Sequence, residues 1–572
     1  MSVSNAVQYL IFLVIVTLCV KPLGGFMHRV FARQRTILDR LCVPMERWIY
    51  RLAAVDPSAE MTAGEYVISF IVFGLICTLL LYAILRFQRI LPSFFPAYQT
   101  TPLSPDLSFN TALSFSTTTT WQAYAGENTM SYLSQMAGLC AQNFLASAAG
   151  LAIGIAFLRG LARESCETLG NFWVDVTRSL LWVLLPAAVI GSLLLVWQGV
   201  PMNFHPYVSA SSVEGTTQII PQGPVAALEI IKNVGTNGGG FFNANGAHPY
   251  ENPTPLSNFL ELLSIVLLPA ALTNTLGRMV GHPRHGWLLY SVMILLFAAG
   301  TIALHLSEQR ANSLVHGADF GGNKLQTGGN MEGKEVRFGV GGTVLGGIVT
   351  SNAATGSVNA ADDSFTSLGG LVLLVNLFLG EVIFGGLGTG LSGMIMTAVI
   401  AVFLAGLMIG RTPEYLGKKI GPCENKMVVL YALSGPASIL ALTAVAVSTK
   451  AGLTGLATNG GPHGLTEIVF GFASSFANNG QSFAGLNANT AFYNVTTAIA
   501  MMAGRYGLAV PTLLFAGIVA RQKNTPPSKG TLPIDSLTFG VLLTAFLVVV
   551  TALSYLPVLT LGPILENLYY KI

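Results

Sequence analysis

Four polar segments of this chain consist largely of small residues whose oxygen atoms could bind a cation. They are residues 114–122, 233–242, 351–358 and 476–483, and each precedes a long apolar stretch. Glycine tolerates backbone dihedral angles that other residues resist, and threonine and serine add hydroxyl oxygens. A potassium ion that gives up its hydration shell needs such oxygen ligands, which rings of backbone carbonyls supply. We therefore interpret the four segments as parts of an ion-selective filter.

The four segments recur at a nearly constant interval. When Thr118, Gly238, Gly356 and Gly480 are treated as equivalent, the intervals are 120, 118 and 124 residues. An aromatic residue lies three positions further on in three of the segments, namely Trp121, Phe241 and Phe483. Such a period indicates repeated structural units. Four surface turns are the alternative, which explains the glycines but not the spacing.

The candidate K⁺ ligands are the central residues of the four segments. They are Thr117, Thr118 and Thr119; Thr236, Asn237 and Gly238; Thr355, Gly356 and Ser357; and Asn478, Asn479 and Gly480. A short pore helix before each segment would direct its partly negative C-terminal end at the ion. Gln122 is expected to form a hydrogen bond behind the first segment.

The composition defines the surroundings of these segments. Of the 572 residues, 52% are hydrophobic and only 10% are charged, against about 25% charged residues in soluble domains. This excludes a soluble or disordered chain and indicates a polytopic membrane protein. The formal net charge of +3 gives no basic footprint for nucleic acid.

Ten apolar stretches are long enough to cross a membrane, which takes about 20 residues. They lie at 5–22, 65–86, 132–158, 178–198, 257–280, 286–306, 365–410, 428–449, 491–519 and 535–557. Most of the 29 Lys and Arg residues fall in the loops that this map assigns to the cytoplasm. Both termini are therefore expected outside the cell. The predicted fold is all-α, with four membrane–pore–membrane repeats in a pseudo-fourfold arrangement.

The repeats predict six units along the chain. An N-terminal helix and cytoplasmic loop occupy 1–60, and a C-terminal helix occupies 531–572. The four repeats lie between them at 61–178, 179–285, 286–426 and 427–530, of which the third contains a long extracellular loop and a broken helix.

The stretch 365–410 is too long for one crossing and contains a glycine-rich interruption at 380–390. Non-helical backbone at membrane depth is tolerated where it is buried in protein or lines a cavity. We expect a broken, pore-lining helix here, with Glu381, Phe384 and Gly385 along the ion path. A soft bend at the membrane interface is the alternative.

Two ionisable residues fall inside predicted crossings and are functional candidates for that reason. Glu381 is expected to attract K⁺ leaving the filter, unless it forms a structural ion pair within the bundle. Arg505 follows the fourth segment and could limit leak, unless it pairs with a carboxylate.

Other charged and histidine residues lie close to the four segments. Glu229 and Glu467 precede two of them and are expected to brace the pore helices or add negative potential. His248 and His463 flank the same two segments. We expect them to be loop histidines rather than metal ligands, because no paired ligand spacing accompanies them.

Together with the segments 252–255 (Asn-Pro-Thr-Pro) and 410–419 (Gly-Arg-Thr-Pro-Glu-Tyr-Leu-Gly-Lys-Lys), the four loops resemble the potassium-binding A subunits (KdpA) of bacterial Kdp potassium-transporting ATPases. The resemblance covers essentially the whole chain. It departs in the first loop, where four threonines stand in place of the asparagines often found there, and in Thr355-Gly356-Ser357. The ligands at these two loops are therefore less well defined.

The resemblance implies a division of labour in a bacterial inner-membrane complex. The A subunit would select external K⁺, and a P-type ATPase subunit, KdpB, would hydrolyse ATP and drive its release. KdpC and KdpF would complete the complex. Arg411, Lys418 and Lys419 could then dock the ATPase subunit, although a basic cytoplasmic end is also an ordinary topology signal.

This chain itself is expected to bind no nucleotide and to catalyse no reaction. No phosphorylatable Asp-Lys-Thr-Gly motif is present, and the one GxxxxGK pattern, at 328–334, is followed by Glu335 instead of the Ser or Thr that would hold Mg²⁺. A stand-alone K⁺ channel or ion-coupled K⁺ symporter of the same superfamily is the first alternative. A sodium-coupled solute transporter is the second, and it would require inverted halves.

Overall fold

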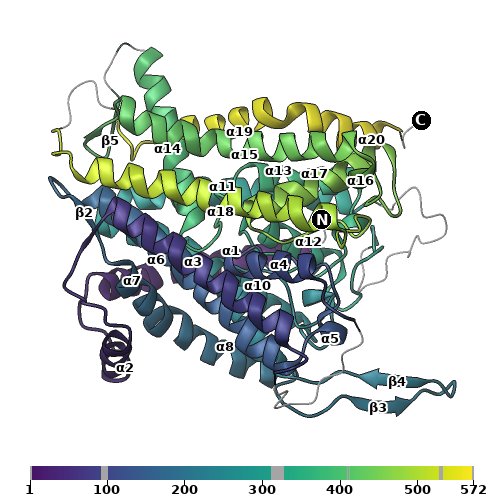
Figure 1. The fold of residues 1–572 in the computed structure, drawn as a ribbon. Helices are drawn as coiled ribbons and strands as arrows, with labels where there is room; N and C mark the ends of the chain where they lie inside the picture. Colours follow the sequence, from purple (N-terminus) through teal and green to yellow (C-terminus); the bar gives the residue numbers. More distant parts are fainter. Residues whose placement is uncertain are drawn as a thin grey trace.

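The computed structural model describes residues 3–91, 101–310, 328–408, 410, 413–526 and 532–569. In these ranges the chain is mostly helical, and the long helices lie side by side in one bundle (Figure 1). Ten helical segments are long and apolar enough to cross a membrane: α1 (Val3–Phe31), α3 (Ala63–Phe87), η1–α6 (Ser134–Ala162), α7–η2–α8 (Phe172–Trp197), α10 (Pro255–Met279), α11 (Pro283–Glu308), α14 (Thr389–Met408), α15 (Pro422–Ser448), α18 (Ala491–Ala520) and α19–η5–α20 (Leu537–Tyr569). The predicted number of crossings is confirmed.

Local sequence explains where these helices begin and where they widen. Thr62 accepts a hydrogen bond from the backbone N–H of Glu65 and so caps α3, and several other helices begin with proline, whose missing N–H costs nothing there. Two π-helical turns, η2 (Ser179–Leu184) and η5 (Thr560–Ile564), lie at Pro186 and Pro563. Such wider turns accommodate a residue that cannot donate to the preceding turn.

Four membrane helices form the inside of the bundle, and they are the ones that follow the four polar loops. In the most apolar stretches of α6, α10, α14 and α18, 83, 72, 61 and 56% of the residues are buried within the chain. The corresponding shares in the other six crossings are 22 to 39%. The inner helix of each repeat therefore packs against protein, while the remaining helices leave apolar side chains for lipid.

Four shorter helices lie inside this bundle, and each directly precedes one polar loop. They are α4 (Pro105–Ser116), α9 (Val225–Val234), α12 (Gly339–Asn352) and α17 (Gly461–Ala477). Most residues of each are buried, and none of the four is long enough to cross the hydrocarbon core. They are the re-entrant pore helices that the sequence predicts.

The seventh crossing is interrupted, as predicted. The short helix α13 (Ser367–Phe378) ends before the glycine-rich segment, and α14 begins only at Thr389. Between them Glu381 and Phe384 have positive φ angles of 56° and 51°. Non-glycine residues rarely adopt this left-handed conformation, so the break is a defined backbone structure and not a soft bend.

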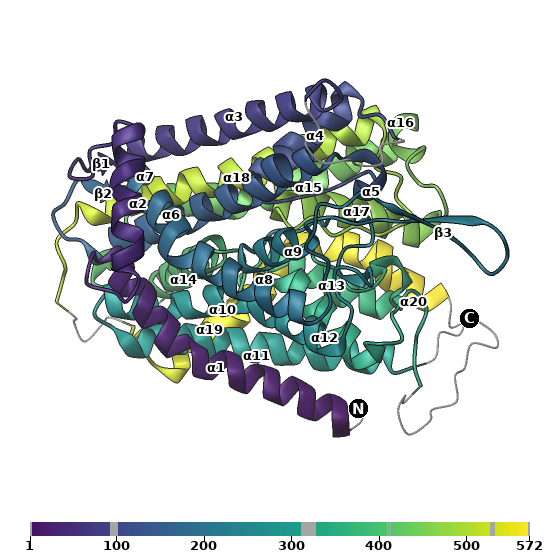
Figure 2. The same ribbon diagram turned by 90° about the horizontal axis from the view of Figure 1, so that it is seen from below.

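In the described ranges, three short antiparallel strand pairs mark the two ends of the bundle. The pair β3–β4 (Val208–Ser211 and Thr217–Ile220) projects from one end, which we call the hairpin end, and both ends of the described chain lie there too (Figures 1 and 2). At the opposite end lie β1–β2 (Met61–Thr62 and Thr168–Gly170) and β5–β6 (Glu414–Tyr415 and Lys418–Lys419). There α2 (Asp39–Leu52) runs across the bundle axis (Figure 2). The remaining short helices are α5 (Gly126–Thr129), α16 (Lys450–Leu453), η3 (Asn245–Ala247) and η4 (Asp362–Ser364).

Candidate ion filter

Each polar loop begins with a residue in the left-handed conformation shortly after its pore helix ends. These residues are Thr118, Thr236, Ala354 and Asn478, with φ angles of 71°, 52°, 51° and 55°. Their positions are 118, 118 and 124 residues apart. A conformation that non-glycine residues rarely adopt occurs four times at matching positions, so these four residues are structural equivalents.

This equivalence corrects the register predicted for the first loop. The sequence alone aligned Thr118 with Gly238. In the structure Thr118 is instead equivalent to Thr236, and Thr120 is equivalent to Gly238, Gly356 and Gly480. Trp121 is therefore no counterpart of the later aromatic residues. The four consecutive threonines have no glycine to mark the register, so residue type alone could not distinguish position 118 from position 120.

The four loops meet in a closed ring. A Cβ atom added to Gly238 would lie 2.6 Å from Gly356 Cα and 2.8 Å from Thr120 Oγ1. A Cβ atom on Gly356 would lie 2.9 Å from the carbonyl carbon of Gly480, and one on Gly480 would meet the backbone of Thr119. Each loop thus touches the next, and the fourth returns to the first. Glycine is required where the backbones approach this closely.

Hydrogen bonds between loops fix this ring on one side. Gln122 accepts a bond from the Gly240 N–H at 2.8 Å and donates Nε2–H to the Gly240 carbonyl at 3.2 Å. The backbone N–H of Gly238 donates to Thr120 Oγ1. Asn237 donates to Ser147 Oγ of the inner helix α6 at 2.7 Å. The first and second loops are therefore held to each other and to the bundle.

The third and fourth loops are braced in the same way. Asn478 Nδ2 donates to Thr119 Oγ1 at 2.9 Å, which joins the fourth loop to the first. Asn479 donates to the carbonyl of Thr350 at 2.8 Å, and Gln481 donates to the hydroxyl of the same threonine at 2.7 Å. A ring held by side chains on all sides is pre-organised, so its oxygens keep their spacing without an ion.

Within the described part of the chain, the side chains of Thr117, Thr355 and Ser357 form no hydrogen bond between loops. The Thr117 hydroxyl donates to the Ser114 carbonyl at 3.1 Å, and the Thr355 hydroxyl donates to the Ala353 carbonyl at 2.9 Å. Ser357 is also buried. Because the two threonine hydroxyls bond to their own loops, the backbone carbonyls are the better candidates for ligands at these positions.

An open cavity lies on one side of the ring. It has a volume of about 770 Å³ and is lined by Thr120, Gly239, Gly356 and Gly480 from the ring and by residues that follow each loop. Asp362 also lines it. Burial raises the pKa of Asp362 to about 8, against the opposing effect of the Lys334 ammonium. This cavity is a wide vestibule in front of the ring.

A smaller cavity lies on the other side of the ring. Its volume is about 40 Å³, which exceeds the roughly 10–15 Å³ that one water molecule occupies by this measure. The four left-handed residues Thr118, Thr236, Ala354 and Asn478 line it, and Glu381 and Arg505 complete the wall. Vestibule, ring and cavity thus follow one another along a single path.

The two ionisable residues of this cavity do not pair with each other. The side chain of Glu381 is buried, and its Oε1 has no hydrogen-bond partner among the described residues. Arg505 donates Nη1–H to Thr118 Oγ1 at 3.2 Å and Nη2–H to the Ala146 carbonyl at 2.9 Å. In the described ranges neither residue forms an ion pair. Among the described residues, no partner supports the alternative of a structural ion pair for either side chain.

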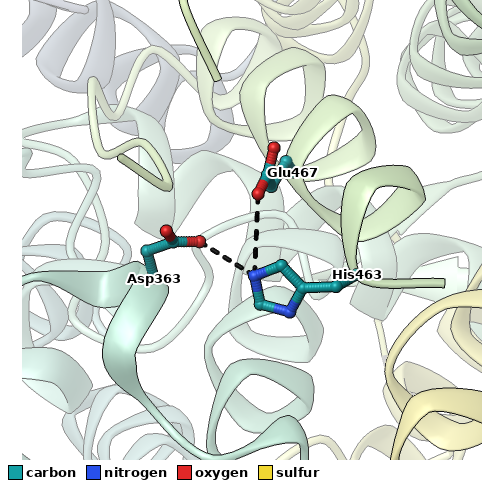
Figure 3. A group of neighbouring side chains, drawn as sticks. All are labelled: Asp363, His463 and Glu467. Carbon is teal, nitrogen blue, oxygen red and sulfur yellow. Dashed lines mark hydrogen bonds and ion pairs between the residues drawn. The ribbon is translucent and has the colours of Figure 1, made fainter. Parts of the chain in front are cut away.

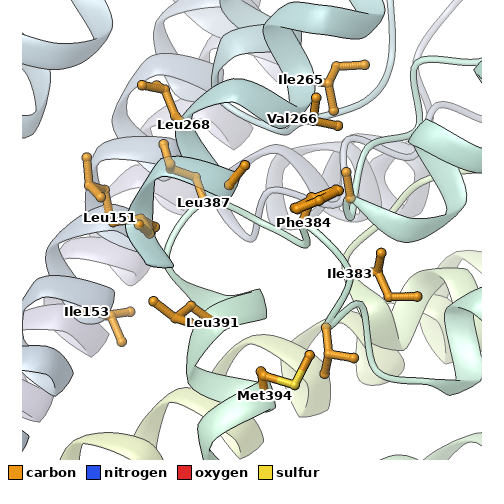
Figure 4. Packing of buried hydrophobic residues seen from close by; sticks show 14 of the residues in the cluster. Leu151, Ile153, Ile265, Val266, Leu268, Ile383, Phe384, Leu387, Leu391 and Met394 are labelled. Carbon is orange, nitrogen blue, oxygen red and sulfur yellow. The ribbon is translucent and has the colours of Figure 1, made fainter. Parts of the chain in front are cut away.

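The helix break packs directly against the ring. The backbone N–H of Leu387 donates to Thr236 Oγ1 at 2.8 Å. Phe384 lies among Ile265, Val266 and Leu387 (Figure 4), with its ring centroid 5.6 Å from that of Tyr290. Gly385 lies against the Glu381 carbonyl, where a Cβ atom has no room. A movement of the break would therefore displace Thr236 in the second loop.

A fully buried charge cluster anchors the second pore helix. Lys232 Nζ lies 2.7 Å from Glu229 Oε2 and 2.9 Å from Glu251 Oε2. Glu251 also accepts the backbone N–H of Phe242 at 2.7 Å. Removing one member would leave the others uncompensated in the interior. Glu229 thus braces α9, which is one of the two roles expected for it.

The basic residues at the opposite end differ in accessibility. Lys418 is 1% exposed, and its Nζ donates to the carbonyls of Arg163 and Gln522 at 2.9 and 2.8 Å. It joins segments of this chain and presents no charge for docking, contrary to the expectation. Lys419 is exposed. Arg411 lies outside the described residues.

Sequence reasoning missed several residues that shape the ring. Thr120 and Ala354 are members of it, and Ser147 and Thr350 brace it from other elements. A constant interval of 118 residues joins Thr120 to Gly238 and Gly356, and this regularity could have identified Thr120. No local pattern marks Ser147 or Thr350, because each contacts a loop far away in the sequence.

Comparison with known proteins gives a consistent result. Residues 10–568 match the family model described as "Potassium-transporting ATPase A subunit". A protein of Koribacter versatilis named "Potassium-transporting ATPase potassium-binding subunit" is 50% identical over 99% of both chains, and one of Methylorubrum extorquens with the same name is 49% identical over 99% of this chain and 98% of its own. The potassium transporter TrkH of Vibrio parahaemolyticus has a similar fold, with a TM-score of 0.52, 12% identity and coverage of 89% of this chain and 97% of its own.

Proposed function

The chain belongs to the family of potassium-transporting ATPase A subunits, and we propose that it selects K⁺ and passes it to an ATP-hydrolysing partner. The observation that carries the proposal is the closed ring of four loops between a wide vestibule and a small inner cavity. Such an arrangement can replace the hydration shell of an ion by fixed oxygens. K⁺ is the transported substrate, and no nucleotide site is assigned to this chain.

The proposed filter comprises the predicted ligands and two residues that the structure adds. The predicted ones are Thr117, Thr118, Thr119, Thr236, Asn237, Gly238, Thr355, Gly356, Ser357, Asn478, Asn479 and Gly480, to which Thr120 and Ala354 are joined. The interloop hydrogen bonds of Gln122 and Asn478 support a fixed ring size. A fixed ring favours one ionic radius over others, since it cannot contract around a smaller ion without breaking these bonds.

We assign opposite roles to the two charges of the inner cavity. The Glu381 carboxylate, which forms no ion pair with a described residue, attracts an ion that leaves the ring, and the adjoining break (with Phe384 and Gly385) forms the wall of its path. Arg505 holds a fixed positive charge beside Thr118, which opposes the accumulation of further cations in the cavity. An ion therefore moves on only when the partner accepts it.

The family and the distribution of basic residues support a proposed assembly and orientation. The chain is a subunit of a potassium-transporting ATPase complex, so its direct partner is the ATPase subunit, KdpB, with Lys419 and Arg411 as candidate contacts. We propose that KdpC and KdpF complete the complex in the inner membrane. Both termini and the vestibule would face outward, because the basic loops lie at the opposite end. Repeats at 61–178, 179–285, 286–426 and 427–530 remain the proposed division.

Reconstitution tests this function directly. The chain is placed in liposomes with and without its ATPase partner, and K⁺ flux is measured with and without ATP. We expect ATP-dependent uptake only when the partner is present. Comparable K⁺ flux through the chain alone would instead favour a self-sufficient channel, and flux that follows a proton or sodium gradient would favour a symporter.

A further inference from the structure

A single histidine connects three segments of the chain at the hairpin end. His463 lies in the first turn of α17, and Asp363 lies in η4, beyond the third loop. The Nε2 atom of His463 is 2.9 Å from Asp363 Oδ1 and 3.7 Å from Glu467 Oε1, while Nδ1 is 3.0 Å from Glu566 Oε1 of α20. Figure 3 shows that Asp363 and Glu467 reach the same ring nitrogen from two sides.

The charges of this cluster do not balance. Among the described residues, none of its three carboxylates forms an ion pair with a lysine or arginine. Even a protonated His463 would leave two negative charges uncompensated. The Glu467 side chain is 0% exposed, and its Oε2 has no hydrogen-bond partner in the described part of the chain. A buried carboxylate in this state is costly unless a further positive charge is present.

We propose that Asp363, His463 and Glu467 bind a divalent transition-metal ion, for which Zn²⁺ fits best. Zinc accepts imidazole nitrogen and carboxylate oxygen at about 2.0–2.2 Å, which places the ligand atoms of a tetrahedral site about 3.3–3.6 Å apart. The separations of 2.9 and 3.7 Å from Nε2 bracket this range, and the three ligand atoms all lie within 4.8 Å of one another. Small side-chain rotations suffice to close the site.

The partner of the second ring nitrogen supports this assignment. A histidine that binds a metal usually donates its other ring N–H to a carboxylate or carbonyl, which fixes the tautomer and the ring orientation. Glu566 occupies that position at Nδ1. It is therefore a positioning residue: with Nδ1–H donated to Glu566, Nε2 is the nitrogen that would bind an ion held between the two carboxylates. Asn459 holds Glu467 by donating to Oε1 at 2.7 Å.

The cluster can also be reached from solvent. The side chains of His463 and Asp363 are 17 and 18% exposed, so an ion can enter and a water molecule can supply the fourth ligand.

The proposed site has a structural consequence. It joins the segment after the third loop, the pore helix of the fourth loop and the last helix of the chain. An ion bound there would hold these elements together at the hairpin end and would lower the tendency of α20 to separate. The sequence predicted that His463 is an ordinary loop residue, because no second metal ligand lies near it at a typical spacing. Two of its partners, Asp363 and Glu566, lie about 100 residues away on either side.

The experiment uses the assembled complex, stripped with a chelator and then dialysed against Zn²⁺. Bound zinc is measured by mass spectrometry, and affinity by titration calorimetry. We expect one Zn²⁺ per chain in the wild type and in the control His205→Asn, which changes an exposed histidine at the same end. His463→Asn should lose at least about 100-fold in affinity. Glu566→Gln keeps all three ligands and should lose about 10- to 100-fold, as other outer partners of ligand histidines do.

The outcomes separate a metal site from a protonated histidine. Zinc that raises the unfolding temperature of the wild type but not of Asp363→Asn would support the site, and millimolar Mg²⁺ should not replace it because the set includes imidazole. An equal zinc content in the wild type and His463→Asn, or no zinc in the wild type above background, would overturn the proposal. If His463→Asn does not assemble, the wild-type stoichiometry and the Glu566→Gln affinity still decide the matter.

Discussion

Gly238 is the position at which a single methyl group tests the ring most directly. In Gly238→Ala the new Cβ atom would lie 2.6 Å from Gly356 Cα, 2.7 Å from Gly356 N and 2.8 Å from Thr120 Oγ1. Ordinary contact begins at 3.4 Å, so Gly356 must retreat by 0.8 Å, the difference between these two distances. Two of the three atoms belong to the backbone of another loop and cannot rotate away.

The expected size of the effect follows from this overlap. Extra methyl groups in a tightly packed interior cost about 1–3 kcal/mol. If the ring takes up the strain by widening, that energy is lost from K⁺ binding and corresponds to an affinity lowered about 5- to 150-fold, at 1.4 kcal/mol per factor of ten. Discrimination against Na⁺ or other ions should change as well, because the oxygens no longer keep their spacing.

The assay is K⁺-stimulated ATP hydrolysis by the reconstituted complex over a range of K⁺ concentrations. Gly64→Ala is the matched control, because no atom lies within 4 Å of its added Cβ, and its K⁺ affinity should equal that of the wild type. Gly238→Asp adds a charge to the same steric change. Its comparison with the alanine variant separates electrostatic from steric effects.

A clear result would refute this reasoning. If Gly238→Ala assembles, unfolds at the wild-type temperature and binds K⁺ within twofold of the wild type, the contact between the second and third loops does not control the ion site. A large effect of the aspartate variant alone would mean that charge near the vestibule matters and ring size does not.

The other predictions concern the supports of the ring and its inner cavity. Thr120→Val removes the acceptor of the Gly238 N–H. An unsatisfied buried donor costs about 1–3 kcal/mol, so the K⁺ affinity should fall by a few-fold to about 100-fold, whereas Thr120→Ser should keep the wild-type affinity. Equal affinities of the valine and serine variants would show that this hydrogen bond does not support the ion site. Glu381→Gln should reduce ATP-driven K⁺ flux more than K⁺ affinity, and the reverse would place Glu381 at the ring itself. Arg505→Met should allow K⁺ leak into liposomes without ATP, measured as passive isotope flux, and an unchanged leak would refute its role as a fixed barrier. Lys418→Met should lower the unfolding temperature, because it removes two charged hydrogen bonds, whereas Lys419→Met should leave this temperature unchanged. If the exposed Lys419 docks the partner, Lys419→Met should weaken assembly of the complex, which co-purification measures.

Recognition of the family from a few segments is confirmed over nearly the whole chain. The loop around Asn237 with the segment 252–255, and the segment 410–419, carried it, and the described residues 413–419 include a constrained turn. Gly417, for example, has a φ of 76° and forms the turn between β5 and β6. Lys418 shows the limit of that reasoning, because its basic charge predicts an accessible surface and the fold buries it.

The sequence by itself determined the elements of this protein. Hydropathy fixes the ten crossings, because a run of apolar residues has no other stable place in a bilayer. Glycine and small polar residues mark the four loops and the break at Glu381, because backbone freedom is a local property. The spacing of the loops also indicates that one chain repeats the same unit four times.

Only the tertiary structure decided how these elements meet. The left-handed backbone at Thr118, rather than its residue type, fixes the register of the first loop. The hydrogen bond of Arg505 to Thr118 and the cluster around His463 join residues roughly 100 to 400 positions apart. Such contacts depend on which surfaces pack together when apolar area is buried, and no pattern within a single segment carries that information.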